Sequence, residues 1–246
     1  MIIVAHRGAS WDAPENTLAA FRLAWDQQAD AVELDLRLSG DGRLMVHHDA
    51  DTRRTCGRRL VIANSSIEQL GELDAGRWKA SAWAGERIPE LAEVIATTPP
   101  GRALMIELKS GPEIVPALSR VLLSCGLANS QITLMAFDVE TMRQVKRALP
   151  DIVCHQVVST RSSRRWGRVA TVDSMIAVAS EAGLDGLNLD AKFVIDAAFA
   201  SRVHAAGLGL HVWTVNDPVK ARALKLAGVD GITTDRPGFM REVLSG

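Results

Sequence analysis

Short apolar stretches alternate with amphipathic stretches along almost the whole chain, and this alternation limits the folds that the chain can adopt. The apolar stretches have the length of buried strands, and the amphipathic ones carry helix start and stop signals. Strands that alternate with helices indicate βα units and a parallel sheet. The predicted strands span residues 2–5, 31–38, 103–108, 132–137, 152–158, 186–189, 208–215 and 230–233. These eight units predict an α/β fold, a TIM (β/α)8 barrel, in a single domain of residues 1–246.

The overall charge and the cysteine content exclude several other classes of protein. The formal net charge is -1 and the pI is near 6.6, so no global field would draw the chain onto nucleic acid or an anionic membrane. No apolar run approaches the roughly 20 residues of a transmembrane segment, and the first apolar run is too short for a signal peptide. Three cysteines without metal-ligand spacing suit a reducing compartment. We therefore expect a cytoplasmic protein, and its oligomeric state stays open.

Two segments depart from the regular alternation. Asp41-Gly42 is a hairpin signal, so the second strand is predicted to fold back on itself over residues 44–48. A turn centred there places Asp35 opposite His48, within one residue. Residues 50–88 hold only one weak helix pattern and are too long for an ordinary connection. They predict a small inserted cap after the hairpin.

Acidic side chains lie within predicted strands that should be buried. Glu33, Asp35 and Arg37 share one face of their strand, because alternate residues of a strand point the same way. A half-exposed polar face would explain them, but a barrel strand has helices on one side and packed side chains on the other. Glu107 adds a third carboxylate at the end of another strand, although a plain ion pair with Lys109 is the alternative. An all-oxygen set of Glu33, Asp35 and Glu107 predicts a site for Mg²⁺ or Ca²⁺.

Two histidines are the candidate proton carriers, because the pKa of free imidazole lies near neutrality. His6 ends the first strand, and His48 folds back beside the carboxylate strand. Each alone would more often be structural, but together they would face a group bound between them. His47 would point away from His48 and is predicted to pack or to face solvent. Arg7 offers a planar fork suited to a phosphate, and Lys109 offers a second positive charge.

Later segments carry weaker signals. Trp213 ends a predicted strand, where its ring would either form the wall of a substrate pocket or cap the core. A basic loop around Trp166 is interpreted as a solvated loop, with an anionic head group or a partner as the alternative; its arginines are Arg161, Arg164, Arg165 and Arg168. The sequence contains no phosphate-cradling GxxxxGK loop, no GxGxxG fingerprint and no GxSxG elbow.

An ordered set of short motifs resembles the glycerophosphodiester phosphodiesterase family. The motifs run in order over nearly the whole chain: His6-Arg7-Gly8, Pro14-Glu15-Asn16-Thr17, Glu33-x-Asp35, His48-Asp49, Leu73-Asp74-Ala75-Gly76, Glu107-x-Lys109, Trp213-Thr214-Val215-Asn216 and Thr234-Asp235-x-Pro237. Each motif is short, but the ordered set is specific. One departure is Ala136-Phe137, where family members often have Ser-Phe, and we expect it to loosen a polar contact in the pocket.

The resemblance implies a TIM barrel that hydrolyses glycerophosphodiesters, which are small-molecule substrates, to glycerol 3-phosphate and an alcohol. It also implies a divalent cation, Mg²⁺ or Ca²⁺, held by Glu33, Asp35 and Glu107. The implied cap is the insertion at residues 50–88. The resemblance implies that His6 and His48 are the general acid/base pair. The expected substrate-binding residues are Arg7, Lys109 and Trp213.

The sequence alone leaves other activities open. A lysophospholipase D or a cyclising phospholipase of the same superfamily would need an exposed apolar rim, for which Trp78 and Trp83 are candidates. A non-catalytic binding barrel would have lost a metal ligand or a histidine, and all of them are present. The attacking oxygen is either water or the neighbouring glycerol hydroxyl, which would give a cyclic phosphate first. The sequence leaves the head group open.

Overall fold

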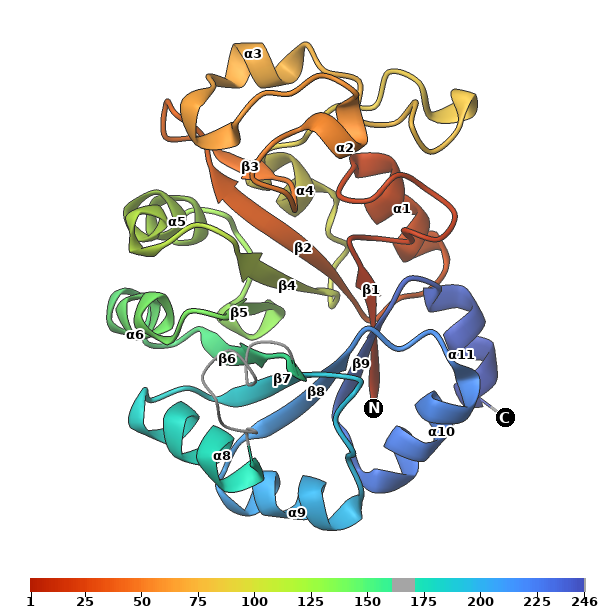
Figure 1. The fold of residues 1–246 in the computed structure, drawn as a ribbon, viewed down its shortest axis with the longest axis vertical. Helices are drawn as coiled ribbons and strands as arrows, with labels where there is room; N and C mark the ends of the chain where they lie inside the picture. The colour runs from red at the N-terminus through yellow and green to blue at the C-terminus, as the bar shows by residue number, and fades with distance from the viewer. Residues whose placement is uncertain (161–170, 246) are drawn as a thin grey trace.

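The computed structural model describes residues 1–160 and 171–245, which fold into a TIM barrel (Figure 1). Within these residues eight parallel strands form a closed sheet, in which β1 pairs with both β2 and β9. The strands are β1 (Ile2–His6), β2 (Ala31–Leu38), β4 (Ala103–Leu108), β5 (Ile132–Ala136), β6 (Val153–Val158), β7 (Gly186–Asp190), β8 (Gly209–Trp213) and β9 (Gly231–Thr234). The predicted strands are confirmed in order, with ends that differ by at most two residues.

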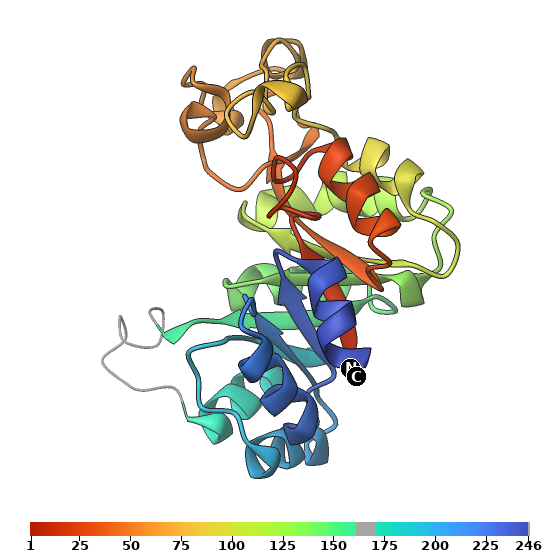
Figure 2. The same ribbon diagram turned by 90° about the vertical axis from the view of Figure 1, so that its right-hand side faces the viewer.

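Helices cover the outside of the barrel (Figure 1, Figure 2). Side chains cap several of them: Thr17 accepts a hydrogen bond from the Ala20 amide at the start of α1, and Asp138 accepts one from the Thr141 amide in α6. The outer helices are α1 (Leu18–Asp26), α4 (Leu91–Thr97), α5 (Val115–Leu122), α6 (Val139–Ala148), α8 (Val172–Glu181), α9 (Ala197–Ala205), α10 (Pro218–Ala227) and α11 (Pro237–Ser245), with the 3₁₀ turns η3 (Pro112–Ile114) and η4 (Asn129–Gln131). Among the described residues, no helix combines the length and the apolar character needed to span a bilayer.

Two apolar layers hold the barrel together. The larger layer lies between the sheet and the helices, and it includes Val32, Leu34 and Leu36 of β2. The smaller layer fills the inside of the barrel with Val4, Ala31, Met105, Met135 and Val157. Because side chains alternate along β2, Glu33 and Asp35 point away from the helices and into the barrel.

The second strand folds back on itself, as the turn signal predicts. It pairs in an antiparallel hairpin with β3 (Leu44–Val46). The His47 amide donates a hydrogen bond to the Asp35 carbonyl at 2.9 Å, so Asp35 lies opposite His47 rather than His48. This difference of one residue is within the predicted margin. It arises because the turn has three residues, 40–42, between the paired ends of the hairpin.

The insertion at residues 50–88 has a small core of its own. Its apolar side chains pack on Met45 of the hairpin and comprise Ile62, Leu70, Leu73, Ala75 and Ile88. Its short helices are α2 (Arg53–Cys56), η1 (Ile62–Asn64), α3 (Ile67–Gly71) and η2 (Ser81–Trp83). The α3 helix corresponds to the weak helix pattern in the sequence, and Ser66 caps it. The insertion, orange to yellow, projects beyond the outer helices at the top of both views (Figure 1, Figure 2).

Gly76 is a position where the insertion has no room for a side chain. A Cβ atom at Gly76 would lie 1.9 Å from the Trp83 carbonyl oxygen, whereas one at Gly71 would meet nothing within 4 Å. We expect Gly76→Ala to lower the free energy of unfolding of the insertion by about 1–3 kcal/mol, the usual cost of overpacking. Hydrogen exchange of residues 74–86 measures this effect, with Gly71→Ala as the control. Equal protection in the two variants would contradict the prediction.

Candidate active site

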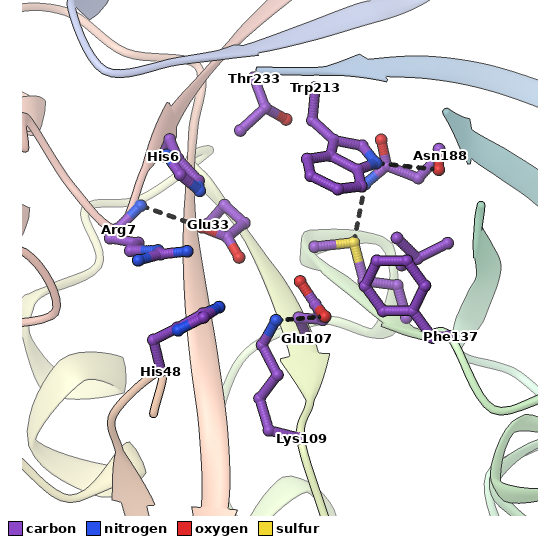
Figure 3. A pocket seen from close by; sticks show the side chains of 12 residues that line it. His6, Arg7, Glu33, His48, Glu107, Lys109, Phe137, Asn188, Trp213 and Thr233 are labelled. Atoms are coloured by element: carbon purple, nitrogen blue, oxygen red, sulfur yellow. Dashed lines mark hydrogen bonds and ion pairs between the residues drawn. The ribbon is translucent and has the colours of Figure 1, made fainter. Parts of the chain in front are cut away.

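A cavity of about 150 Å³ opens at the mouth of the barrel (Figure 3). Its lining residues are His6, Arg7, Glu33, His48, Glu107, Lys109, Met135, Phe137, Val157, Asn188, Trp213 and Thr233. Many of them lie at the C-terminal ends of strands, which is the face of a TIM barrel where active sites form. All of the predicted site residues except Asp35 line the cavity, and Asp35 Oδ1 lies 3.1 Å from Nζ of the lining residue Lys109.

Three carboxylates meet at one side of the cavity. Glu33, Asp35 and Glu107 are buried, and each offers an oxygen atom within 4.8 Å of those of the other two. They come together because Asp35 and Glu107 are paired residues of β2 and β4, and Glu33 is on the same face of β2. Burial and the charge of Asp35 raise the pKa of Glu33 to about 8. Burial, together with the charge of Asp35, also raises the pKa of Glu107.

These three carboxylates fit a hard divalent cation. All of the ligand atoms are oxygens, the type that Mg²⁺ and Ca²⁺ prefer. Asp35 Oδ1 is buried without a hydrogen bond, although Lys109 Nζ lies 3.1 Å from it. A bound cation would offset the repulsion among the carboxylates that raises two of their pKa values. The donor set suits Mg²⁺ and Ca²⁺ alike.

Two cationic side chains lie against the carboxylates. Lys109 Nζ is 2.5 Å from Glu107 Oε1 and 3.1 Å from Asp35 Oδ1. Arg7 Nε is 3.0 Å from Asp35 Oδ2, and the Arg7 backbone amide donates a hydrogen bond to Glu33 Oε2 at 2.9 Å. Burial would raise the pKa of Asp35, but the charges of Lys109 and Arg7 outweigh burial and hold it well below its usual range. Asp35 is therefore the carboxylate that stays ionised without a cation.

His6 is held by a carboxylate from the other end of the chain. Its Nδ1 lies 2.6 Å from Asp235 Oδ1, and Asp235 accepts hydrogen bonds from Ser10 Oγ at 3.1 Å and Asn216 Nδ2 at 2.5 Å. Burial lowers the pKa of His6, but the hydrogen bond to Asp235 and the charge of Glu33 outweigh burial and raise it above its ordinary value. His6 therefore favours the protonated state, and its ring is directed into the cavity (Figure 3).

His48 also has a carboxylate partner, but its pKa shifts the other way. Its Nδ1 lies 2.6 Å from Asp49 Oδ1. Burial lowers the pKa of His48, the charge of Asp35 opposes this effect, and the charges of Arg7 and Lys109 reinforce it, so the net shift is downward. His48 therefore favours the neutral state. Two groups whose surroundings move their pKa values in opposite directions are suited to act as an acid and a base.

The other side of the cavity is largely apolar. Trp213 and Phe137 meet edge to face with ring centroids 5.8 Å apart, and Trp213 Nε1 donates a hydrogen bond to the Asn188 carbonyl oxygen at 3.1 Å. Trp213 lines the cavity, which favours its interpretation as a pocket wall. Ala136, the departure from the family pattern, packs in the layer outside the barrel. The expected loss of a polar contact in the pocket was therefore wrong.

Several singled-out residues lie away from the cavity. His47 is buried, and its Nε2 lies 3.0 Å from Thr55 Oγ1, which agrees with a packing role. Trp78, in the insertion, is exposed, whereas Trp83 is partly buried. The arginines around Trp166 lie outside the described residues.

The structure adds residues to which the sequence patterns gave no role. Asp235 and Asp49 hold the two histidines, and each lies within a motif of the family resemblance. Asp235 and His6 are 229 residues apart, so no local pattern reports their contact. Asn188 and Thr233 line the cavity. Neither of them belongs to one of the motifs found in the sequence.

Comparisons with known sequences point to one family. The glycerophosphoryl diester phosphodiesterase family matches residues 6–239. A Bacillus subtilis relative is named provisionally as a glycerophosphodiester phosphodiesterase. It is 34% identical over 242 residues, which cover 98% of this chain and 96% of the relative. A glycerophosphodiester phosphodiesterase of Caldanaerobacter subterraneus is 30% identical over 240 residues, which cover 96% of this chain and 94% of that protein.

Solved structures give the same result. A phosphodiesterase of Oleispira antarctica, in complex with the product sn-glycerol-3-phosphate, is 29% identical and matches with a TM-score of 0.90 over 100% of this chain and 97% of that one. A structure from Silicibacter pomeroyi shares the fold with a TM-score of 0.88 at 23% identity, covering 100% of this chain and 93% of that one. The chain therefore belongs to the glycerophosphoryl diester phosphodiesterase family.

Proposed function

We propose that this phosphodiesterase hydrolyses glycerophosphodiesters to glycerol 3-phosphate and an alcohol, with a divalent cation and a histidine acid/base pair. The observation that carries the proposal is that three carboxylates, two cationic side chains and two carboxylate-held histidines meet around one cavity. The Oleispira antarctica phosphodiesterase has sn-glycerol-3-phosphate as its product, which supports the same product here. In this proposal residues 1–246 form one phosphodiesterase domain, and residues 50–88 are its inserted cap.

Glu33, Asp35 and Glu107 are the proposed ligands of the cation, Mg²⁺ or Ca²⁺. When bound there, the cation neutralises phosphate charge and positions or activates the attacking oxygen. Arg7 and Lys109 bind the phosphate oxygens, Arg7 through the planar fork of its guanidinium and Lys109 as a point charge. Their ion pairs with Asp35 hold both side chains at the cavity, so little further ordering is needed when substrate binds.

His48 is the general base and His6 the general acid in this proposal. The lowered pKa of His48 keeps its ring neutral, so Nε2 accepts the proton of the attacking oxygen, which is water or the neighbouring glycerol hydroxyl. The raised pKa of His6 favours the protonated ring, from which Nε2 gives a proton to the leaving alkoxide. Asp49 and Asp235 each accept a hydrogen bond from Nδ1, which leaves Nε2 for the substrate.

Trp213 and Phe137 cover the carbon skeleton of the substrate in this proposal. Their rings lie on the apolar side of the cavity, across from His6, Arg7 and His48 (Figure 3). Aromatic faces and edges of this kind pack against the carbon atoms of a ligand while charged groups bind its phosphate. The lysophospholipase D and cyclising alternatives are not favoured, because the named relatives are glycerophosphodiester phosphodiesterases.

The cysteines support a cytoplasmic location for the proposed activity. Cys56, Cys125 and Cys154 are free thiols. Burial raises the pKa of Cys154 to about 12, which keeps this thiol protonated and unreactive. Free thiols of this kind are typical of proteins that work in a reducing compartment.

Product analysis tests the proposed function. The protein is freed of bound metal with EDTA, and a panel of glycerophosphodiesters is then supplied with Mg²⁺, Ca²⁺ or Mn²⁺. We expect glycerol 3-phosphate and the free alcohol, formed only when a divalent cation is present. Turnover that EDTA leaves unchanged would overturn the metal assignment. The absence of glycerol 3-phosphate with every combination of substrate and cation would overturn the function itself.

A further inference from the structure

Arg54, in helix α2 of the insertion, joins two segments of the barrel mouth. Its Nε lies 2.7 Å from Asp49 Oδ2. Its Nη1 and Nη2 each lie 2.7 Å from one carboxylate oxygen of Glu15. Asp49 follows the β3 hairpin, and Glu15 lies in the loop between β1 and α1. One guanidinium of the insertion therefore holds two segments that are far apart in the sequence.

Both carboxylates also contact residues of the proposed catalytic site. Asp49 Oδ1 lies 2.6 Å from His48 Nδ1. Glu15 Oε1 lies 2.8 Å from Arg7 Nη1, and the Glu15 side chain is largely buried. The contacts form a continuous chain from His48 through Asp49, Arg54 and Glu15 to Arg7. The proposed base and the proposed phosphate-binding arginine are thus linked through a residue that belongs to the insertion.

We propose that Arg54 is a positioning residue, through which the insertion sets the orientation of His48 and Arg7. This inference rests on the proposed function, and it gives the insertion a part in the chemistry besides that of a cap. The Arg54 side chain is 43% exposed, and exposed ion pairs contribute little to stability. A purely stabilising role therefore accounts poorly for three charge-assisted hydrogen bonds made by one side chain.

The geometry of a guanidinium suits this role. Arg54 donates one hydrogen bond to Asp49 and two to Glu15 from a single rigid plane. A lysine at the same position would offer one compact ammonium group, which cannot reproduce that planar pattern. With Asp49 fixed, the Nδ1 proton of His48 has a fixed acceptor. With both carboxylate oxygens of Glu15 held by Arg54, Glu15 Oε1 is a fixed acceptor for Arg7 Nη1, which fixes the guanidinium of Arg7 at the cavity.

Arg54→Ala and Arg59→Ala form a matched pair for testing this proposal. Arg59 lies in the same insertion, is 57% exposed and pairs with Asp51 at 2.7 Å, outside the chain of contacts described above. We expect Arg54→Ala to lower kcat by about 10–100-fold, the usual effect of removing a group that orients a residue of the site. Arg59→Ala should keep the kcat of the unsubstituted protein. Equal kcat in the two variants would overturn the proposal.

A double-mutant cycle separates positioning from a general structural effect. If Arg54 acts on His48 through Asp49, the loss in kcat caused by Arg54→Ala should shrink when Asp49 is already replaced by Asn. Additive losses would contradict this route. Arg54→Lys keeps the charge and serves in the cycle if Arg54→Ala does not fold. It should still lose about tenfold in kcat, because it cannot form the planar set of contacts.

NMR of protein labelled with ¹⁵N-histidine gives a readout that needs no turnover. In the unsubstituted protein the His48 ring should be a single tautomer that carries its proton on Nδ1. Arg54→Ala should give an average of two tautomers, whereas Arg59→Ala should leave the signal unchanged. An unchanged His48 signal in Arg54→Ala would overturn the proposal. A lack of turnover in the unsubstituted protein would instead refute the proposed function, and the NMR comparison would still decide the role of Arg54.

Discussion

His48→Ala should fold normally and lose nearly all phosphodiesterase activity. The His48 side chain is 34% exposed and is held at Nδ1 by Asp49, so its removal opens no cavity in the core. The attacking oxygen loses its base, and we expect kcat to fall by about 10²–10⁴-fold. Steady-state turnover of a glycerophosphodiester, together with a thermal melt, measures both parts of the prediction.

The neighbouring histidine provides a matched control. His47 is 4% exposed, and its ring lies 3.0 Å from both the Asp49 carbonyl oxygen and Thr55 Oγ1. His47→Ala leaves buried polar groups without their partner, so we expect it to lower the free energy of unfolding by about 1–3 kcal/mol. The folded fraction should keep its kcat. Turnover of His48→Ala at the level of the unsubstituted protein would refute the role of His48 as a base.

Divalent cations should stabilise the protein more strongly at pH 8 than at pH 5.5. The pKa of Glu33 in the folded protein, about 8, lies above its ordinary value of 4.5. Between pH 4.5 and pH 8, Glu33 is protonated in the folded protein and ionised in the unfolded chain, so the folded protein binds more protons. The stability of the cation-free protein therefore falls as the pH rises through this window, by up to about 1.4 kcal/mol per pH unit for this group. A bound cation competes with the proton on Glu33. The cation therefore stabilises the protein more at the higher pH, where Glu33 would otherwise ionise without a cation beside it.

Thermal denaturation in EDTA and in excess Mg²⁺ or Ca²⁺, at both pH values, measures this difference. A cation at about 100 times its Kd stabilises a folded protein by about 2.7 kcal/mol. Glu33→Gln is the control, because it keeps the size of the side chain and removes its titration. At pH 8 the cation-free variant should be more stable than the unsubstituted protein, and the cation should no longer stabilise it. Equal cation effects at both pH values would contradict the assignment of Glu33 as a ligand.

The barrel was predictable because its signals are local. Each predicted strand is a short apolar run between helix signals, and the order of these runs already fixes a βα repeat. The carboxylates were predictable for a related reason. Glu33 and Asp35 are the polar members of an apolar strand, and period-two alternation turns them to the same side of the sheet.

The contacts that organise the site were not predictable, because they join distant segments. His6 and Asp235 are 229 residues apart, and Arg54 and Glu15 are 39 apart. Whether two such side chains meet depends on how the sheet closes and on how the insertion packs, and the local sequence reports neither. The observed hairpin register differs by one residue from the centre of the predicted range. The reason is local, because the Asp41-Gly42 signal fits turns of both two and three residues.

The contact between His6 and Asp235 also relates the proposed activity to protein synthesis. Asp235 is made 229 residues after His6, and this interval takes roughly 10–45 s at about 5–20 residues per second. The proposed cation ligands are complete once Glu107 has been made, well before Asp235, the partner of the proposed acid His6. The proposed enzyme therefore becomes able to hydrolyse a diester only after Asp235 has been made and β9 has closed the barrel.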